Sequence, residues 1–309
     1  MYMEHFFSVD QLEIDTIYDL CEQAKQFSQE SFQLDQQIFA ANVFTEPSTR
    51  TKLSFIAAQR KLGLEVLEVE GTQSSIVKGE SLEDTVITLE AIGAEVLIIR
   101  DKSNEWMHGL QDKVSIPMIN AGAGTAEHPT QCMLDVYTLY EEFGSFKDLN
   151  IVIAGDVAHS RVAHSNIQTL KRLGANVYTS CAPTFVDSSL DVPNITMDEA
   201  VECADCVMLL RIQHERHEGE ETRTGNYLEQ YGLTKKREVQ MKKRAIIMHP
   251  GPVNRDIEMD GSLIYCERSR IKQQIQNGVY MRMSIIIYML KKWGIIHESF
   301  TNECISCEQ

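Results

Sequence analysis

The stretch Ile38-Phe39-Ala40-Ala41-Asn42-Val43-Phe44-Thr45-Glu46-Pro47-Ser48-Thr49-Arg50-Thr51 joins an apolar run to a turn and a helix start. A short, continuous apolar run bounded by a turn is typical of a buried strand, and Ser48 is a favourable N-cap. The helix is expected from about Thr49 to Leu62, where Gly63 ends it. A buried strand that passes through a tight turn into a helix is the repeating unit of parallel α/β sheets.

The same alternation of apolar runs and helical patterns continues along the chain, with glycines after several helices. Further strands are expected at residues 65–69, 94–99, 150–154, 176–179, 205–210 and 245–248, and another is expected to end at 118–119. Further helices are expected at residues 81–92, 129–143, 161–173 and about 279–292. This order predicts an α/β protein with two doubly wound domains, each a mostly parallel sheet covered by helices on both faces.

The polar segment 142–150 lies between an expected helix and a new strand and is the best domain boundary. We therefore expect a first domain at residues 1–143, a second at 144–278, and a C-terminal helix within 279–309 that packs back on the first domain. Open parallel sheets bind ligands at the carboxyl ends of their strands. An active site is therefore expected in the cleft between the domains.

Composition argues against several classes of protein. Lys and Arg total 29 against 45 Asp and Glu, so the formal net charge of the 309 residues is −16, and such a chain repels a nucleic-acid backbone. No apolar run approaches the ~20 residues of a membrane helix, and the first residues lack a signal-peptide pattern. The eight cysteines are scattered, which favours free thiols. We expect a cytoplasmic protein that binds neither nucleic acid nor a membrane.

The strand ends of the first half carry groups that suit an anion. Residues 48–51, Ser-Thr-Arg-Thr, form the first turn of a helix, where free N–H groups and the helix dipole favour negative charge. Arg100 follows the strand at 94–99, and His128 precedes a proline at a helix entrance. The simpler interpretations are an N-cap with a surface arginine, a charge that marks the protein surface, and a structural histidine.

The strand ends of the second half carry a further set of polar groups. Arg161 opens a helix, Arg211 and Gln213 follow the strand at 205–210, and the loop 249–252 follows the strand at 245–248. Two arginines at adjacent strand ends suit a dicarboxylate, because each guanidinium can hold one carboxylate through two hydrogen bonds. Together the two halves predict two anionic ligands that meet between the domains.

Other chemistries lack their motifs. The run Gly122-Ala123-Gly124 fails as a dinucleotide fingerprint because Glu127 takes the place of the third glycine, and no G-x-x-x-x-G-K-[ST] loop is present. The cysteine pairs at 203/206 and 304/307 lie too far apart for a usual zinc site. We therefore expect no metal site and no cofactor.

Four motifs stand in chain order over most of the sequence. They are Phe44-Thr45-Glu46-Pro47-Ser48-Thr49-Arg50-Thr51, His128-Pro129-Thr130-Gln131, Leu210-Arg211-Ile212-Gln213-His214-Glu215-Arg216 and His249-Pro250-Gly251-Pro252-Val253-Asn254-Arg255. Together they resemble the catalytic chains of the aspartate carbamoyltransferase family, from about residue 38 to 290. Transcarbamylases generally share the first two motifs. The last two indicate the aspartate branch, because an ornithine enzyme is expected to have His-Cys-Leu-Pro at 249–252.

The resemblance implies transfer of the carbamoyl group from carbamoyl phosphate to the amine of L-aspartate. The products are N-carbamoyl-L-aspartate and phosphate, in de novo pyrimidine (UMP) synthesis, and no cofactor is needed. Arg50, Thr51, Arg100 and His128 would be the catalytic residues. The implied contacts with carbamoyl phosphate are Ser48, Thr49, Arg50 and Thr51 on the phosphate, Thr51, Arg100 and His128 on the carbonyl oxygen, and Gln131 with the backbone carbonyls of Pro250 and Gly251, next to Pro252, on the amide.

The resemblance also implies an aspartate site and an assembly. Arg161 would take the α-carboxylate, and Arg211 with Gln213 the side-chain carboxylate. The implied assembly is a homotrimer with shared active sites, in which Lys78, also a contact of aspartate, and Ser75 enter from the neighbouring subunit, with Ser74 as the alternative to Ser75. Glu46 would pair with Arg161 and Arg216 when the domains close. The sequence leaves open whether regulatory chains bind the trimer.

Two positions depart from the family pattern, and three other functions stay open. Lys52 replaces a usual second arginine, and Gly251 replaces a usual leucine or alanine. A transcarbamylase for ornithine or another amine is the first alternative, but a cationic substrate would call for acidic residues where Arg211 stands. The others are a catalytically silent scaffold subunit and a dinucleotide-binding dehydrogenase, which the missing glycine fingerprint disfavours.

Overall fold

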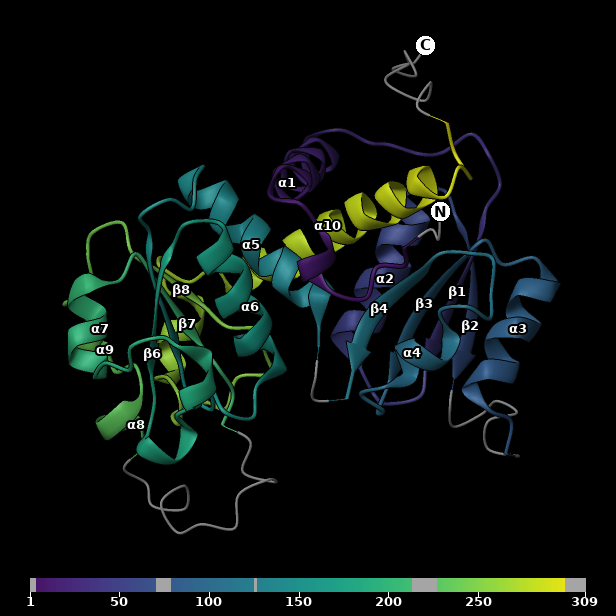
Figure 1. Cartoon of the computed structure of the whole chain (residues 1–309). Coiled ribbons are helices and arrows are strands. Elements are labelled where there is room, and N and C mark those ends of the chain that lie inside the picture. The colour runs from purple at the N-terminus through teal and green to yellow at the C-terminus, as the bar shows by residue number, and fades with distance from the viewer. Residues whose placement is uncertain (1–3, 71–78, 125–126, 213–226, 298–309) are drawn as a thin grey trace.

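The chain folds into two α/β lobes that lie side by side (Figure 1). The computed structural model describes residues 4–70, 79–124, 127–212 and 227–297. Within these residues each lobe contains one four-stranded sheet, and every strand pair is parallel. The predicted α/β fold class, with two parallel sheets flanked by helices, is confirmed.

The first sheet has the spatial order β2-β1-β3-β4. Strands β1, β3 and β4 are almost entirely buried, as expected of parallel strands covered on both faces. Its strands and the helices that follow them are β1 (Phe39–Phe44), α2 (Thr49–Lys61), β2 (Glu65–Glu70), α3 (Leu82–Ile92), β3 (Val96–Asp101), α4 (Trp106–Leu110), β4 (Met118–Ala123) and α5 (Pro129–Phe143).

The second sheet repeats this topology, with the spatial order β6-β5-β7-β8. In both sheets the chain moves from the first strand to one side and returns on the other side, so a switch point lies between β1 and β3 and between β5 and β7. The elements of this lobe are β5 (Asn150–Ala154), α6 (Arg161–Arg172), β6 (Asn176–Ser180), α7 (Met197–Cys203), β7 (Cys206–Leu209), α8 (Tyr227–Tyr231), α9 (Lys235–Glu238) and β8 (Ile246–Met248).

Two helices from opposite ends of the chain, α1 (Ile14–Gln29) and α10 (Ile271–Lys292), pack against each other beside the first lobe (Figure 1). Helix α10 also contacts α2 and α5. The prediction that this helix begins near 279 was wrong, because its first turns carry buried polar residues rather than an apolar stripe. Gln274 and Asn277 are buried there through hydrogen bonds to α5. Short 3-10 helices complete the described elements: η1 (Val9–Gln11), η3 (Pro183–Phe185), η4 (Ser188–Leu190) and η7 (Gly261–Tyr265).

The bounds of strand β4 differ from the predicted ones, and the register of this strand accounts for the glycine at position 122. The expected strand ended at 118–119, but β4 begins at Met118 and continues to Ala123. The register between β3 and β4 shifts after Ile99, so that Arg100 lies opposite Gly122. A Cβ on Gly122, whose φ is +140°, would lie 3.2 Å from Arg100 Nη1. The glycine therefore gives the Arg100 side chain room to pass over β4.

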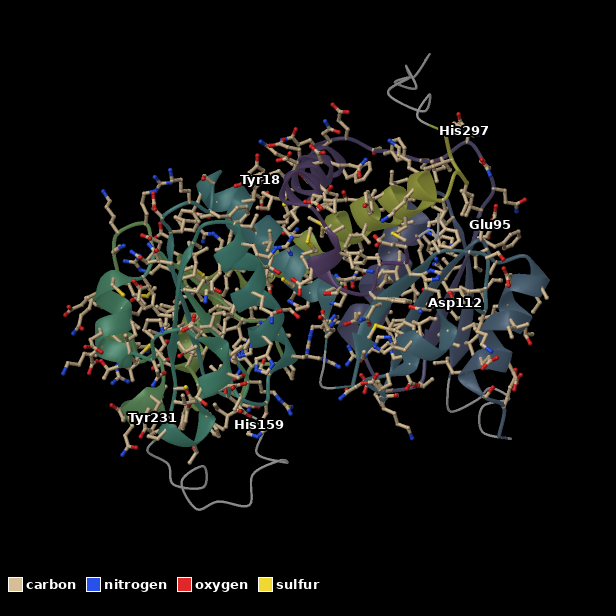
Figure 2. The ribbon with its side chains drawn as sticks, viewed as in Figure 1. Tyr18, Glu95, Asp112, His159, Tyr231 and His297 are labelled. Carbon is tan, nitrogen blue, oxygen red and sulfur yellow. The ribbon has the colours of Figure 1, made fainter. Side chains whose placement is uncertain are left out.

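Apolar side chains fill the space between the sheets and the helices in each lobe (Figure 2). One cluster of buried residues extends across both lobes and includes residues of α1, α5, α6 and α10. The lobes are therefore joined by a packed apolar core. The division of the chain at residues 143–144 stays a prediction.

Candidate active site

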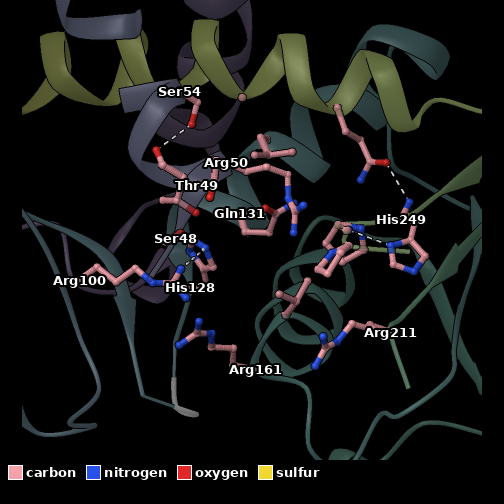
Figure 3. Close-up of a pocket in the computed structure, with 18 of the residues that line it drawn as sticks. Ser48, Thr49, Arg50, Ser54, Arg100, His128, Gln131, Arg161, Arg211 and His249 are labelled. Carbon is pink, nitrogen blue, oxygen red and sulfur yellow. Dashed lines mark hydrogen bonds between the residues drawn. The ribbon is translucent and has the colours of Figure 1, made fainter. Parts of the chain in front are cut away.

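A cavity of about 570 Å³ lies between the lobes, at the carboxyl ends of the strands (Figure 3). Its wall is formed by segments at the ends of β1, β3, β4, β5, β7 and β8, and by helix α10. The switch points of open parallel sheets are where such proteins bind ligands. The sequence predicted a site in a cleft between the two domains. The structure has a cavity there, and residues of both lobes line it.

The N-terminal end of α2 supplies one wall of this cavity. Ser48 is the N-cap residue, and its side chain makes no capping hydrogen bond. Because the first N–H groups of a helix have no partner within the helix, this end presents N–H donors beside the hydroxyls of Thr49 and Thr51. Partial burial lowers the pKa of Arg50, and the nearby Arg211 and Arg100 lower it further. The cavity therefore concentrates positive charge that an anion would offset.

Arg100 reaches the cavity from β3 and is held by Glu46. Its Nε lies 2.6 Å from Glu46 Oε1, and its Nη1 lies 3.5 Å from His128 Nε2. Burial lowers the pKa of Arg100, while the pair with Glu46 acts in the opposite direction. Glu46 Oε1 also lies 3.7 Å from Arg161 Nη2. One carboxylate thus joins arginines of both lobes, including the expected Arg161.

His128 is the N-cap residue of α5 and is 5% exposed. Burial lowers the pKa of its imidazole well below the usual value, and the positive charges of Arg161, Arg100 and Arg282 lower it further. The ring is therefore neutral at pH 7 and keeps one N–H donor. Its Nδ1 is buried and has no hydrogen-bond partner in the described part of the chain. A neutral donor at this position suits a substrate carbonyl oxygen.

Gln131 is oriented by a buried carboxylate behind it. Its Nε2 donates to Asp135 Oδ1 at 3.0 Å, and Asp135 also accepts from Gln274 Nε2 at 2.8 Å and Asn166 Nδ2 at 3.0 Å. Burial raises the pKa of Asp135 to about 6, against the effect of these hydrogen bonds. The carboxylate is ionised at neutral pH and can only accept, so it fixes the amide of Gln131 with its oxygen free for an N–H donor.

The turn after β8 forms the opposite wall. Gly251 N–H donates to His249 Nδ1 at 2.8 Å, and His249 N–H donates to Gln274 Oε1 at 2.9 Å. Pro250, Gly251 and Pro252 all line the cavity. The side chains of His249 and Gln274 thus hold the backbone of this turn against the site.

The second lobe contributes Arg161 and Arg211. Arg161 is the first residue of α6, and the N-cap residue Ser160 accepts from Ala163 N–H. The Nη1 atom of Arg161 donates to the carbonyl of Gly124. Arg211 follows β7 at the neighbouring strand end. Both line the cavity, and Figure 3 shows them on the side opposite Ser48 and Thr49. The predicted pair of carboxylate-binding arginines therefore faces the predicted anion cradle.

Several predicted site residues lie outside the described residues. These are Ser75 with its alternative Ser74, Lys78, Gln213 and Arg216. The remaining predicted residues all line one cavity: Ser48, Thr49, Arg50, Thr51, Arg100, His128, Gln131, Arg161, Arg211, Pro250, Gly251 and Pro252.

The two departures from the family pattern have visible structural partners. Lys52 Nζ lies 2.8 Å from Glu68 Oε2 on β2. Gly251 has a φ of +69°, and a Cβ there would lie 3.3 Å from Arg50 Cζ. The glycine therefore suits both the backbone conformation of the turn and the close approach of the Arg50 guanidinium.

Arg282 is a charged residue of the cavity wall that escaped the sequence analysis. It lies on α10, is 2% exposed and lines the cavity. Its guanidinium lies 5.0 Å from the ring centre of Phe55 and donates to the carbonyl of Gly278 at 2.8 Å. Burial lowers its pKa to about 9, so it stays charged at pH 7. The sequence did hold a signal for this residue, because a charged side chain between Met281 and Met283, inside an apolar helix, is unusual unless it has a role there.

The described residues contain no group of three or more His, Cys, Asp or Glu arranged to hold a metal ion. None of the helices in those ranges is both long and apolar enough to cross a membrane.

Two family models match the chain, one for each half. Residues 4–141 match the carbamoyl-P binding domain of aspartate/ornithine carbamoyltransferases, and residues 147–289 match the Asp/Orn binding domain. The aspartate carbamoyltransferase catalytic subunit of Oceanobacillus iheyensis is 54% identical over 299 residues, with 96% of each chain covered. That of Listeria innocua is 47% identical over 294 residues, with 94% of this chain and 97% of the relative covered.

Solved structures of aspartate transcarbamoylases have the same fold as this chain. Aspartate transcarbamoylase from Trypanosoma cruzi in complex with carbamoyl aspartate and phosphate has a TM-score of 0.84 and 28% identity, covering 92% of this chain and 95% of the other. The catalytic subunit of M. jannaschii aspartate transcarbamoylase has a TM-score of 0.82 and 28% identity, covering 94% and 98%. With both halves of the chain matched, and a relative 54% identical over nearly its full length, the chain belongs to the aspartate/ornithine carbamoyltransferase family, among the aspartate carbamoyltransferase catalytic subunits.

Proposed function

We propose that this chain catalyses transfer of the carbamoyl group from carbamoyl phosphate to L-aspartate, and that the cavity between its lobes is the active site. The observation that carries the proposal is that Arg50 and Arg100 of the first lobe and Arg161 and Arg211 of the second line the same cavity. The Trypanosoma cruzi enzyme has been solved with carbamoyl phosphate and aspartate bound together. Two anionic substrates require such a concentration of positive charge if they are to react side by side.

The proposed carbamoyl phosphate site uses the first lobe and the turn 250–252. The N-terminal end of α2, with Ser48, Thr49, Arg50 and Thr51, takes the phosphate through N–H, hydroxyl and guanidinium groups. The free oxygen of Gln131 and the carbonyls of Pro250 and Gly251 accept from the carbamoyl amide. The support is geometric, because each of these groups lines one cavity and the Gln131 amide is already oriented by Asp135.

The proposed aspartate site lies in the second lobe. Arg161 binds the α-carboxylate, and Arg211, with Gln213 beside it in the sequence, binds the side-chain carboxylate. A guanidinium recognises a carboxylate through two parallel hydrogen bonds, which gives both binding energy and orientation. Arg161 is positioned for this by its place at the start of α6 and by its bond to the Gly124 carbonyl.

The proposed mechanism needs only binding, orientation and charge stabilisation. The neutral amine of aspartate attacks the carbamoyl carbon, a C–N bond forms and negative charge develops on the carbonyl oxygen. Arg100, the neutral His128 and the Thr51 hydroxyl stabilise that charge. The bond between the carbon and the phosphate oxygen then breaks, and the departing phosphate accepts the amine proton. Atoms and charge balance without an external acid or base.

We further propose that the chain works in the cytoplasm, in pyrimidine synthesis, as a homotrimer with shared sites. In this assembly Ser75 and Lys78 enter the cavity of a neighbouring subunit, and regulatory chains are a further candidate partner. The support is the resemblance of the motifs. The proposed domain limits are 1–143 and 144–278, with a C-terminal part at 279–309. Helix α10 (Ile271–Lys292), which begins before residue 279, contacts α1 and α2.

A ligand that joins both substrate halves tests the proposed function without turnover. N-(phosphonacetyl)-L-aspartic acid is bound in a Trypanosoma cruzi aspartate transcarbamoylase structure. Isothermal titration of this chain is expected to show binding at least ~100-fold tighter than that of phosphonoacetate, because two linked anionic groups engage two half-sites at once. Equal affinity for both ligands would show that the second lobe does not bind the aspartate portion.

A further inference from the structure

A cluster of buried polar side chains lies behind the turn 250–252. His249 and Glu258 are each 1% exposed, and His249 Nε2 lies 3.2 Å from Glu258 Oε1. On the other side of the ring, His249 Nδ1 accepts from Gly251 N–H at 2.8 Å. Since Nδ1 accepts, the ring proton is on Nε2 and is donated to Glu258. The imidazole therefore links the turn to a buried carboxylate through one hydrogen bond on each side of the ring.

The same carboxylate also holds Asn254, two residues beyond the turn 250–252. Glu258 Oε1 accepts from the backbone N–H of Asn254 at 2.5 Å. The Asn254 side chain extends to the segment that follows β7, where its Nδ2 donates to the carbonyl of Ile212 at 2.9 Å. Ile212 is fully buried and directly follows Arg211. A hydrogen bond therefore links the loop after β8 to the segment that carries the arginine proposed for the side-chain carboxylate of aspartate.

The cluster continues into the first half of the chain. His249 N–H donates to Gln274 Oε1, and Gln274 Nε2 donates to Asp135 Oδ1, which also accepts from Gln131. Asp135 and Gln274 are 0% and 2% exposed. An unbroken path of hydrogen bonds thus runs from Gln131, on the carbamoyl side, to the backbone beside Arg211, on the aspartate side.

We propose that Asn254 is a positioning residue for Arg211, and that Glu258 and His249 tie its position to the turn 250–252. Asn254 touches neither substrate in this scheme. It fixes the backbone that carries the aspartate-binding guanidinium, relative to the turn whose carbonyls face the carbamoyl amide. The inference rests on the proposed function, because it assigns Arg211 to aspartate. Its specific consequence is that loss of the Asn254 side chain weakens aspartate binding and leaves carbamoyl phosphate binding in place.

The test is the Asn254→Ala variant of the full chain. At saturating carbamoyl phosphate, the KM for aspartate is expected to rise about fivefold to tenfold, the effect of losing one buried neutral hydrogen bond. The Kd of carbamoyl phosphate, measured by titration without aspartate, is expected to stay within about twofold, because the bonds of His249 to Gly251, Gln274 and Glu258 do not use the Asn254 side chain.

Asn194→Ala is the matched control, because Asn194 also joins two segments of the second lobe but makes its hydrogen bonds to Thr179 and Cys181 and not to the segment that carries Arg211. Its Oδ1 accepts from Thr179 Oγ1 at 3.1 Å and from Cys181 N–H at 3.2 Å. This control is expected to leave the KM for aspartate unchanged. If Asn254→Ala does not fold, Asn254→Ser, whose hydroxyl is too short to reach the carbonyl, replaces it.

The possible outcomes separate the inference from the function. No turnover by the unaltered chain would reject the proposed function itself. Turnover by the unaltered chain, with a KM for aspartate in Asn254→Ala within about twofold of it, would overturn the positioning role. An equal loss of affinity for both substrates, or a similar loss in Asn194→Ala, would also overturn it, because the effect would then be a general loosening of the lobe.

Discussion

Replacement of Arg100 by alanine is expected to lower kcat by at least ~10²–10³-fold, the usual effect of removing one preorganised donor to a developing oxyanion. Arg100 is partly buried beside Glu46 and His128, and its Nε lies 2.6 Å from Glu46 Oε1. Its orientation is therefore set before substrate arrives, and little reorganisation is needed as charge develops on the carbonyl oxygen. Initial rates at saturating carbamoyl phosphate and aspartate, measured for both proteins, check the expectation.

Arg268→Ala serves as the matched control for this variant. Arg268 also makes an ion pair, 2.7 Å from Nε to Glu238 Oε1, and donates to backbone carbonyls, but it does not line the cavity. The control is expected to keep normal kcat even if its melting temperature falls. Turnover of Arg100→Ala close to that of the unaltered chain would remove Arg100 from the proposed mechanism.

The second large effect is expected from Arg211→Ala, in the KM for aspartate. Truncating one partner of a buried, hydrogen-bonded charge pair typically costs ~2–5 kcal/mol, so the KM is expected to rise at least about 30-fold. The Kd of carbamoyl phosphate is expected to change far less. Removing this positive charge also relieves its repulsion of Arg50, one of the causes that lower the pKa of Arg50. Rates against aspartate concentration, with a parallel titration of carbamoyl phosphate, separate the two effects.

Arg211→Lys distinguishes charge from geometry at the same position. A lysine keeps the positive charge but cannot form the two parallel hydrogen bonds of a guanidinium. We expect this variant to recover only part of the lost affinity. An unchanged KM for aspartate in Arg211→Ala would mean that the side-chain carboxylate is held elsewhere in the cavity.

Local patterns predicted most of the fold. Helix α5 (Pro129–Phe143) and strand β5 (Asn150–Ala154) have the predicted bounds, because Pro129 and Gly144 mark the helix ends and a β-branched run marks the strand. The end of strand β4 was placed too early, at 118–119, because Ala121, Gly122 and Ala123 carry little side-chain signal. Their place in the sheet depends on the neighbouring strand β3.

It was predictable that the first turn of α2 and the arginines at the strand ends would lie around one cavity, because the topology alone brings the strand ends together. The groups that orient them were not predictable. Asp135 and Gln274 are 139 residues apart, and neither belongs to a local motif. Their meeting depends on the packing of α10 against α5, and the polar start of α10 hid the beginning of that helix. Buried hydrogen-bond partners at such separations follow from tertiary structure and not from sequence spacing.

The central claim is that this cavity joins carbamoyl phosphate to aspartate rather than to another amine. The most direct test is a colorimetric assay for the ureido product. The purified chain is given carbamoyl phosphate with either L-aspartate or L-ornithine, without added metal or nucleotide. We predict product with aspartate and none with ornithine, because Arg161 and Arg211 present positive charge to the incoming amino acid. Product with ornithine alone, or with neither amino acid, would contradict the account.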